Sequence, residues 1–315
     1  MKKNKLIIIS GPTGVGKTSL SIKLAKKLNT EIISADSMQI YKNMNIGTAK
    51  ITPQETQGVI HHMIDIIRPD ESYSVEMYRR EVFKILENIW SKNKIPIICG
   101  GTPMYIQSIL YNLNFSEHST NSAVKNKIEE ERKKDNLWDF NILNYIDPEM
   151  FNKISRNDHK RIARAIEYFI CTNTKYSSKE YNFLNKNTEF DWTLYFLNMN
   201  RSSLYQIIDK RVDKMVEEGL IDEVNHLLQL YNTEDNLQSL QAIGYKELIQ
   251  YLNNEIDLNS AINLIKKRSR NYAKRQMTWF RRDKNAFLVP VDLFSQEIIL
   301  DTIINNLNLE EACTI

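Results

Sequence analysis

The sequence predicts an α/β fold in which a parallel sheet is flanked by helices and carries an all-helical insertion domain. One observation is local, because the apolar run Leu6–Ile9 leads into a glycine-rich loop that is followed by a helical pattern at 19–28. A second is the recurrence of short β-branched runs, mostly separated by helical patterns, which is typical of parallel sheets. A third is the interval 113–192, which has helical periodicity and no convincing buried strand.

The first loop has the pattern of a phosphate-binding loop, since G-P-T-G-V-G-K-T stands between a strand and a helix. Its glycines let backbone N–H groups turn inward around an anion, and Lys17 adds a point charge. Thr18 offers a hydroxyl to Mg²⁺ at the helix N-terminus. We expect a diphosphate to be bound by Gly11, Pro12, Thr13, Gly14, Val15, Gly16, Lys17 and Thr18. The loop alone leaves the identity of that diphosphate open.

The later elements follow from the same periodicities. We expect strands at 6–9, 31–34, 95–99, 194–199 and 287–289, and helices at 204–218, 221–231 and 260–282. The expected core therefore comprises residues 1–112 and 193–315 and ends in a basic helical segment. The expected helical insertion domain comprises residues 113–192.

Composition indicates a globular protein of a reducing compartment. The chain has 315 residues, 42% of them hydrophobic, which is enough for a substantial core. Its three cysteines, Cys99, Cys171 and Cys313, share no metal-ligand or redox spacing. The apolar run before the loop, about four residues, is too short for a secretion signal, and no stretch approaches membrane-spanning length. We expect a cytoplasmic protein without a membrane partner.

The positive charge is concentrated in one segment. The net charge is +3, but Lys266–Lys284 holds nine basic residues and one acid, a net +8, so the rest of the chain carries about −5. Cations and aromatic rings share a helical stripe there, at Arg268, Tyr272, Arg275, Trp279 and Arg282. This mixture favours a nucleic acid, through phosphate contacts and base stacking, over a merely solvated helix face. Trp279 or Phe280 is expected to anchor the helix in the core.

Asp36 is the first candidate for chemistry outside the loop. It follows the second strand, whose carboxyl end opens onto the same crevice as the phosphate-binding loop. The carboxylate fits three roles equally well: binding Mg²⁺ through water, capping a helix, or accepting a proton as a general base.

Three other patterns are less specific. The run Gly100-Gly101-Thr102 fits either a close approach to a ligand or a tight strand-to-helix turn. Lys210 and Arg211 lie on an expected helix, where one cation faces a diphosphate or pairs with a neighbouring acid. His61 and His62 are adjacent, so they point to different sides of the backbone and are expected to be structural.

Eight segments together resemble the tRNA dimethylallyltransferases, the enzymes that prenylate an adenine of the anticodon loop. They run in order along nearly the whole chain: G-P-T-G-V-G-K-T, S-A-D-S-M-Q-I-Y-K, I-G-T-A-K, H-H-M-I-D, G-G-T, R-I-A-R-A-I-E, Q-A-I-G-Y-K-E and A-K-R-Q-M-T-W-F-R-R. The resemblance implies transfer of a dimethylallyl group from dimethylallyl diphosphate to N6 of adenosine 37. Diphosphate leaves, and N6-(dimethylallyl)adenosine forms.

The resemblance also implies a role for individual residues. Arg211 assists the loop with the diphosphate, Mg²⁺ is the cofactor at Thr18, Asp36 is the general base, and Thr102 lies at the reaction channel. Contacts to tRNA are implied for Asp36, Ser37, Met38, Gln39, Thr102, Lys160, Arg161, Arg164, Gln241, Gly244, Arg275 and Gln276. Adenosine 37 is expected to flip into the channel while the insertion clamps the anticodon stem-loop. Because one chain supplies both halves of that clamp, a monomer is expected.

Two residues depart from the family pattern. Pro103 stands where glycine is common, which stiffens the turn beside Thr102. Ile207 replaces a common arginine, which leaves the cationic clamp to Arg211 and Lys17. The segment after Val291 has no Cys/His zinc-finger pattern, so the bacterial type is expected.

Three alternatives remain. An adenylate isopentenyltransferase would share the loop and Asp36 but has little use for the basic segment. A nucleoside or shikimate-type kinase would transfer phosphate to a small acceptor. A non-catalytic RNA-binding module would bind tRNA and leave the prenyl diphosphate unchanged.

Overall fold

The computed structural model describes residues 3–113, 122–178, 185–231 and 237–312, and the chain divides into two compact units. The first unit comprises residues 1–110 and 186–315, and the second comprises residues 111–185. The sequence patterns set the limits of the insertion at 113 and 192, whereas residues 191 and 192 belong to a strand of the first unit.

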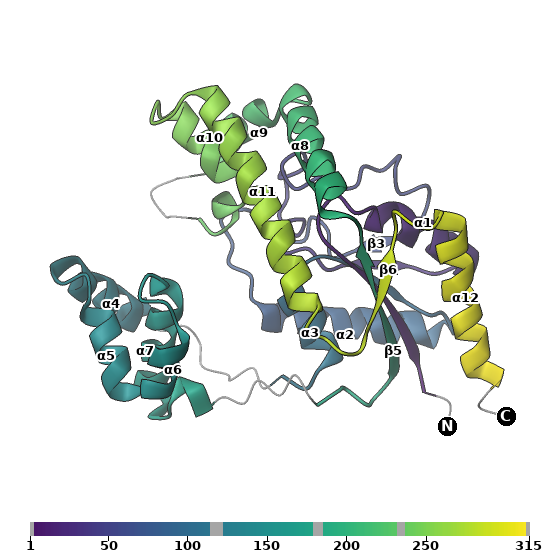
Figure 1. The fold of residues 1–315 in the computed structure, drawn as a ribbon, viewed down its shortest axis with the longest axis horizontal. Coiled ribbons are helices and arrows are strands. Elements are labelled where there is room, and N and C mark those ends of the chain that lie inside the picture. Colours follow the sequence, from purple (N-terminus) through teal and green to yellow (C-terminus); the bar gives the residue numbers. More distant parts are fainter. Residues whose placement is uncertain (1–2, 114–121, 179–184, 232–236, 313–315) are drawn as a thin grey trace. The chain divides into compact units, whose positions relative to one another are not determined.

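A six-stranded parallel sheet forms the centre of the first unit (Figure 1), which confirms the expected α/β fold. The strand order is β3-β2-β4-β1-β5-β6. The strands are β1 (Lys5–Ser10), β2 (Ile32–Ser34), β3 (His61–His62), β4 (Ile97–Gly100), β5 (Asp191–Asn198) and β6 (Ala286–Pro290). In β1, Ile7, Ile8 and Ile9 are fully buried, as expected of a parallel strand whose two faces are both covered.

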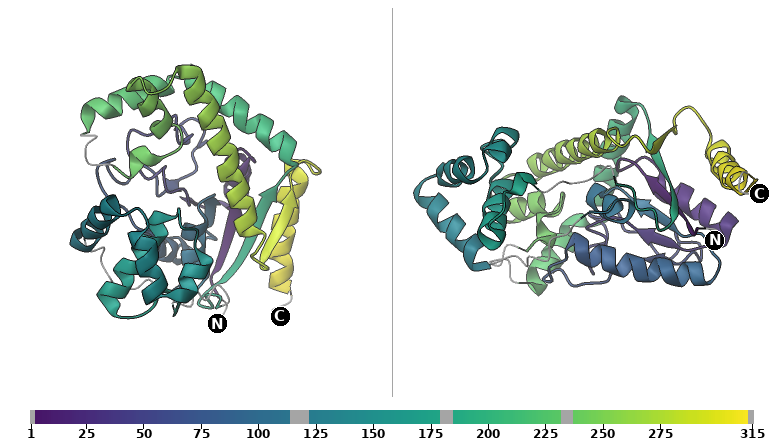
Figure 2. Two further views of the ribbon diagram at one scale, coloured as in Figure 1. Left: turned by 60° about the vertical axis from the view of Figure 1, so that its left-hand side comes forward. Right: turned by 90° about the horizontal axis from the view of Figure 1, so that it is seen from below.

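Helices pack on both faces of this sheet. The helices α1 (Lys17–Leu28) and α12 (Gln296–Ala312) lie side by side (Figures 1 and 2), and Lys23 and Lys27 of α1 pair with Glu297 and Asp301 of α12. The helix α2 (Val75–Ser91) packs against α3 (Pro103–Leu110). Tyr78 of α2 is buried and donates its hydroxyl to the carbonyl of Ser34 at 3.0 Å, which ties α2 to the end of β2.

A layer of helices covers the carboxyl end of the sheet (Figure 1). Its members are α8 (Arg201–Glu217), α9 (Leu220–Leu230), α10 (Tyr245–Leu252) and α11 (Leu258–Phe280), and a short 3₁₀ helix at Ser239–Gln241 precedes α10. Phe280 is 1% exposed and stacks on Phe196 of β5 at 4.9 Å, so the expected aromatic anchor of α11 is confirmed. Gly219 separates α8 from α9 with a φ of 97°, a left-handed conformation that glycine adopts without strain.

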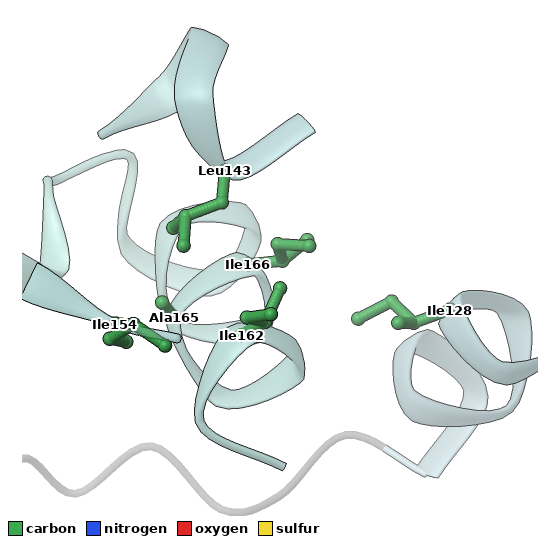
Figure 3. Close-up of a cluster of buried hydrophobic side chains, with 6 residues drawn as sticks. All are labelled: Ile128, Leu143, Ile154, Ile162, Ala165 and Ile166. Atoms are coloured by element: carbon green, nitrogen blue, oxygen red, sulfur yellow. The ribbon is translucent and has the colours of Figure 1, made fainter. Parts of the chain in front are cut away.

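The second unit is helical in its described residues and has a core of its own. It contains α4 (Ser122–Lys134), α5 (Trp138–Ile146), α6 (Pro148–Lys153) and α7 (His159–Thr172), followed by a 3₁₀ helix at Tyr176–Ser178. The buried cluster consists of Ile128, Leu143, Ile154, Ile162, Ala165 and Ile166 (Figure 3). Asp147 caps α6 by accepting from the N–H of Met150 at 3.1 Å, and it also accepts from Ser177 at 2.7 Å.

The two ends of this insertion are joined within the first unit. Asn187, which is 3% exposed, donates its backbone N–H to the carbonyl of Leu110 at 2.8 Å. Its side-chain amide donates to the carbonyl of Ile109 at 3.4 Å. The chain therefore leaves the core after α3 and returns to it at nearly the same point.

The structure adds details that the sequence patterns missed. The strand β3 is only two residues long, and its histidines have different partners: His62 bonds Glu31 at 2.7 Å, whereas His61 bonds the carbonyl of Val59 at 2.9 Å and also lines the smaller of the cavities described below. Cys99 and Cys171 are free thiols, while Cys313 lies outside the described residues. Within the described part of the chain, no helix combines the length and apolar character needed to cross a membrane.

Candidate active site

Two adjoining cavities open at the carboxyl end of the sheet, where the phosphate-binding loop meets the helical layer. The larger has a volume of about 320 Å³ and the smaller about 100 Å³. The residues that line both are Thr13, Asp36, Thr48, Arg211 and Tyr272. The larger cavity extends toward α10 and α11, and the smaller extends along the loop and β4.

The loop has the backbone geometry that its glycines predict. A side chain on Gly11 would lie 2.7 Å from the carbonyl oxygen of Leu197 in β5, so only glycine fits there. Gly16 precedes α1 with a φ of 93°, a left-handed conformation that glycine adopts without strain. The first N–H groups of α1 have no acceptor within the helix and are available to an anion.

Lys17 is held inside the loop. Its ammonium donates to the carbonyls of Gly11 and Pro12 at 3.0 and 2.9 Å. Burial above all, together with the positive charge of Arg211, lowers the pKa of Lys17 to about 8, while Cys99 and Asp36 act in the opposite direction. The lysine thus lacks a counterion that fully compensates its burial, which suits it to an incoming anion.

Asp36 and Thr102 lie together at the ends of neighbouring strands. One carboxylate oxygen of Asp36 accepts from the N–H of Met38 at 2.9 Å, which caps the turn after β2. The Thr102 hydroxyl accepts from the N–H of Ser37 at 3.0 Å. Gly100 packs so closely on Ala35 that a side chain there would lie 2.3 Å from its carbonyl oxygen. The close backbone contact between Gly100 and Ala35 therefore fixes the turns that carry Asp36 and Thr102 relative to each other.

Arg211 faces the loop from α8. Its guanidinium donates to the hydroxyl of Thr13 at 3.2 Å, and burial lowers its pKa while the charge of Asp36 raises it. Arg211 and Lys17 are the cationic side chains that line the smaller cavity. Ile207, one turn earlier on α8, is 39% exposed and lies above Gly14, where it adds no charge.

Gln276 joins the loop to the turn after β4. It is 2% exposed, its amide oxygen accepts from the N–H of Thr13 at 3.0 Å, and its amide nitrogen donates to the carbonyl of Gly101 at 2.7 Å. A side chain on Gly101 would lie 2.2 Å from that nitrogen. Because both amide groups are bonded to backbone, Gln276 holds the loop and this turn together, a contact that the sequence pattern did not suggest.

The basic helix α11 is only partly free to meet a polyanion. Lys266 pairs with Asp213 and Arg270 with Asp209, both at 2.5 Å, and Arg268 pairs with Glu247. These pairs neutralise charges in the first part of the basic segment 266–284. Lys274 and Arg275, nearer the carboxyl end of α11, are exposed. Arg275 lines the larger cavity, and its guanidinium carbon lies 5.7 Å from the centre of the Tyr272 ring. This pair is one example of the expected mixture of cations and aromatic rings.

The remaining implied RNA contacts fall into two groups. The residues of the first unit that line the larger cavity are Asp36, Ser37, Met38, Gln241, Gly244 and Arg275, while Gln39 lines the smaller one. In the second unit, Lys160 and Arg161 are exposed on α7, and Arg164 pairs with Glu167 at 2.9 Å. Sequence reasoning placed Tyr272 only in the stripe of α11 and missed Thr48 and Glu223, which meet the site through contacts between distant segments.

The chain was compared with known families, sequences and structures. A model of the IPP transferase family matches residues 39–283. A tRNA dimethylallyltransferase of Finegoldia magna is 47% identical over 283 residues, which cover 90% of each chain.

Three crystal structures are similar over almost the whole fold. A tRNA isopentenylpyrophosphate transferase of Staphylococcus epidermidis is 42% identical, with a TM-score of 0.72 over 97% of this chain and 99% of that one. The enzyme of the same description from Bacillus halodurans is 37% identical, with a TM-score of 0.72 over 99% of each chain. A eukaryotic dimethylallyltransferase acting on tRNA is 32% identical, with a TM-score of 0.77 over 91% of this chain and 74% of its own. The chain therefore belongs to the IPP transferase family.

Proposed function

We propose that this chain transfers a dimethylallyl group from dimethylallyl diphosphate to N6 of adenosine 37, next to the anticodon of tRNAs. The reaction breaks the bond between C1 of the prenyl group and the diphosphate oxygen and forms the bond between N6 and C1. N6 loses one proton, and the products are N6-(dimethylallyl)adenosine and diphosphate. The observation that carries this proposal is the shared wall of the two cavities, where Asp36, Arg211 and Thr13 lie between the phosphate-binding loop and the open end of the larger cavity.

The smaller cavity suits the prenyl donor. The loop and α1 offer N–H groups to the diphosphate, and Lys17 and Arg211 supply positive charge as negative charge develops on the leaving group. Part of the wall of this cavity is apolar, because Ile32, Ile51 and Ile64 line it beside polar residues. A five-carbon hydrocarbon chain is compatible with that wall.

Asp36 is placed to act as the general base. It lines both cavities, so its carboxylate lies where a nucleophile in the larger cavity would meet C1 of a donor in the smaller one. Met38 N–H binds one carboxylate oxygen at 2.9 Å, which orients the group and leaves lone pairs for N6–H. A purine inside a loop stack cannot reach this depth, so the adenosine flips into the cavity. Tyr272 and the exposed Arg275 offer an aromatic and a planar cationic surface on its wall.

Mg²⁺ fits the residues at the loop, and we propose that it binds with the diphosphate. Thr18 offers a hydroxyl at the start of α1, and the carboxylate of Asp36 lines the same cavity. The described residues contain no group of three or more His, Cys, Asp or Glu side chains that could hold a metal ion by themselves. We therefore propose that phosphate oxygens and water supply the other ligands of the Mg²⁺. When bound, Mg²⁺ neutralises charge on the departing diphosphate.

The surfaces of both units suit a tRNA partner. The carboxyl part of α11 presents the exposed Lys274 and Arg275, and α7 presents the exposed Lys160 and Arg161. We propose that the second unit clamps the anticodon stem-loop and that a monomeric chain suffices for this. We also propose that the protein acts in the cytoplasm, because its proposed substrate is tRNA.

The function is tested by incubating the purified chain with Mg²⁺, dimethylallyl diphosphate and unmodified tRNA, followed by nucleoside mass spectrometry. We expect N6-(dimethylallyl)adenosine from tRNA, and none from the same tRNA with guanosine at position 37 or from AMP in a parallel reaction. Product from AMP alone would support the free-nucleotide enzyme instead. Absence of product from every acceptor would contradict the transferase proposal.

A further inference from the structure

A single carboxylate on α9 binds a loop from the opposite wall of the site. Glu223 accepts from three successive backbone N–H groups, those of Asn45 at 2.8 Å, Ile46 at 2.7 Å and Gly47 at 3.1 Å. It also accepts from the hydroxyl of Tyr245 at 2.6 Å. Three consecutive N–H groups directed at one anion form a backbone nest. This carboxylate therefore has four strong donors and is the centre of a specific contact.

The contact requires a glycine in the loop and a phenol in α10. A side chain on Gly47 would lie 2.5 Å from the ring of Tyr245, so the loop packs directly on that ring. Tyr245 is fully buried, and burial raises its pKa, so the hydroxyl keeps its proton and donates to Glu223. The segments I-G-T-A-K and Q-A-I-G-Y-K-E, which carry Gly47 and Tyr245, are thus two parts of one internal contact.

The bound loop forms part of both cavities. Gly47 and Thr48 line the larger one, and Thr48 lines the smaller one as well. The Thr48 hydroxyl donates to the carbonyl of Met44 at 2.7 Å, and the amide of Gln39 donates to the carbonyl of Thr48 at 3.3 Å. Any displacement of residues 45–47 therefore changes the wall opposite Arg211.

The contact joins the two sides of the site across a large sequence distance. The loop follows β2 and Asp36, whereas Glu223 and Tyr245 belong to the helical layer that carries Arg211, and 176 to 178 residues separate the bonded groups. We propose that Glu223 and Tyr245 are positioning residues that fix the spacing between the wall bearing Asp36 and the wall bearing Arg211. This inference deepens the proposed transferase function and rests on it.

The test compares Glu223→Gln and Tyr245→Phe with the wild-type chain. In Glu223→Gln an uncharged amide, itself partly a donor, would face the three backbone N–H groups, so we expect hydrogen exchange in the peptide spanning 44–48 to accelerate about tenfold. The single-turnover rate at saturating donor and tRNA should also fall about tenfold, because the walls are misplaced. The dissociation constant of dimethylallyl diphosphate should rise by no more than about threefold, because Arg211 is displaced relative to the opposite wall while the loop and Lys17 are untouched. Tyr245→Phe keeps the ring on Gly47 and loses one hydrogen bond, so about a threefold fall is expected.

Glu218→Gln is the matched control, because Glu218 is an exposed glutamate near the same helix whose ion pair with Lys214 is 3.4 Å long. It should change neither exchange nor rate. Unchanged exchange in Glu223→Gln would overturn the inference, and so would accelerated exchange with a normal rate. An equal loss of donor affinity and rate would also overturn it, because that pattern indicates general unfolding. If the wild-type chain transfers no prenyl group, the proposed function fails while the exchange measurement still tests the contact.

Discussion

The binding of dimethylallyl diphosphate is predicted to weaken as the pH rises through about 8, because Lys17 loses its proton there. Burial is the main reason that the pKa of this lysine falls from 10.5 to about 8, and the positive charge of Arg211 is a smaller one. The direction follows from the charge: the ammonium form is present below the pKa and attracts the diphosphate, and the neutral amine above it does not.

The size of the effect follows from the pKa. If the diphosphate binds only the ammonium form, a pKa of about 8 makes the dissociation constant rise about eightfold between pH 7.5 and pH 9. An ordinary lysine with a pKa of 10.5 would change the constant by only about 3% over the same range. The window starts above the second ionisation of a phosphate, near pH 6, so the charge of the ligand is nearly constant.

Isothermal titration calorimetry at pH 7.5, 8, 8.5 and 9 measures this dependence, at constant ionic strength and Mg²⁺. Lys17→Arg is the matched control, because a guanidinium stays protonated throughout, and its dissociation constant should be nearly independent of pH. Circular dichroism at each pH confirms that the chain stays folded. A wild-type dissociation constant that is flat from pH 7.5 to 9 would refute the proposed state of Lys17.

Three further predictions concern other parts of the site. Asp36→Asn should lower the single-turnover rate by about 10² to 10⁴ while tRNA affinity changes little, as filter binding would report; an unaltered rate removes Asp36 from the base role. Gln276→Leu should weaken donor binding and lower the melting temperature, because the Thr13 N–H loses its buried acceptor; loss of tRNA affinity alone would instead favour an RNA contact. Lys274→Ala should reduce the slope of log affinity for tRNA against log salt by about one, whereas Lys266→Ala, already paired with Asp213, should alter it less; equal slopes for the two variants would argue against a role for ion pairing.

Much of the fold could be predicted because its signals are local. The strands β1, β2, β4, β5 and β6 lie where β-branched runs predict them, and α8, α9 and α11 follow their helical periodicities within a few residues. The strand β3 could not be predicted, since two residues carry no periodicity and pair only because Ile32 and Ile33 of β2 lie beside them. Local pattern therefore determined the elements, and neighbouring strands determined the edge of the sheet.

The site was predictable to the extent that each role lies in one short segment. The loop, Asp36 and Thr102 follow directly after strands, where a parallel sheet places ligands. The roles of Gln276 and Glu223 could not be inferred from spacing, because their partners are 263 and up to 178 residues away. The same limit applies to Arg268. Its expected contact with RNA was inferred from the pattern of α11 alone, whereas its ion-pair partner, Glu247, belongs to α10.

The joint at Asn187 has a consequence for how the chain can vary. Its hydrogen bonds to Ile109 and Leu110 join the two chain segments that flank the insertion. The second unit is therefore a branch that leaves the core and returns to it at one point. The entropic cost of closing the core across the branch grows only slowly with the number of residues in it, by about 0.6 kcal/mol for each doubling of a flexible loop. If the second unit is the proposed clamp, we expect replacement of the branch to alter which RNA stem is accepted and to leave the phosphate-binding loop, Lys17 and Arg211 unchanged.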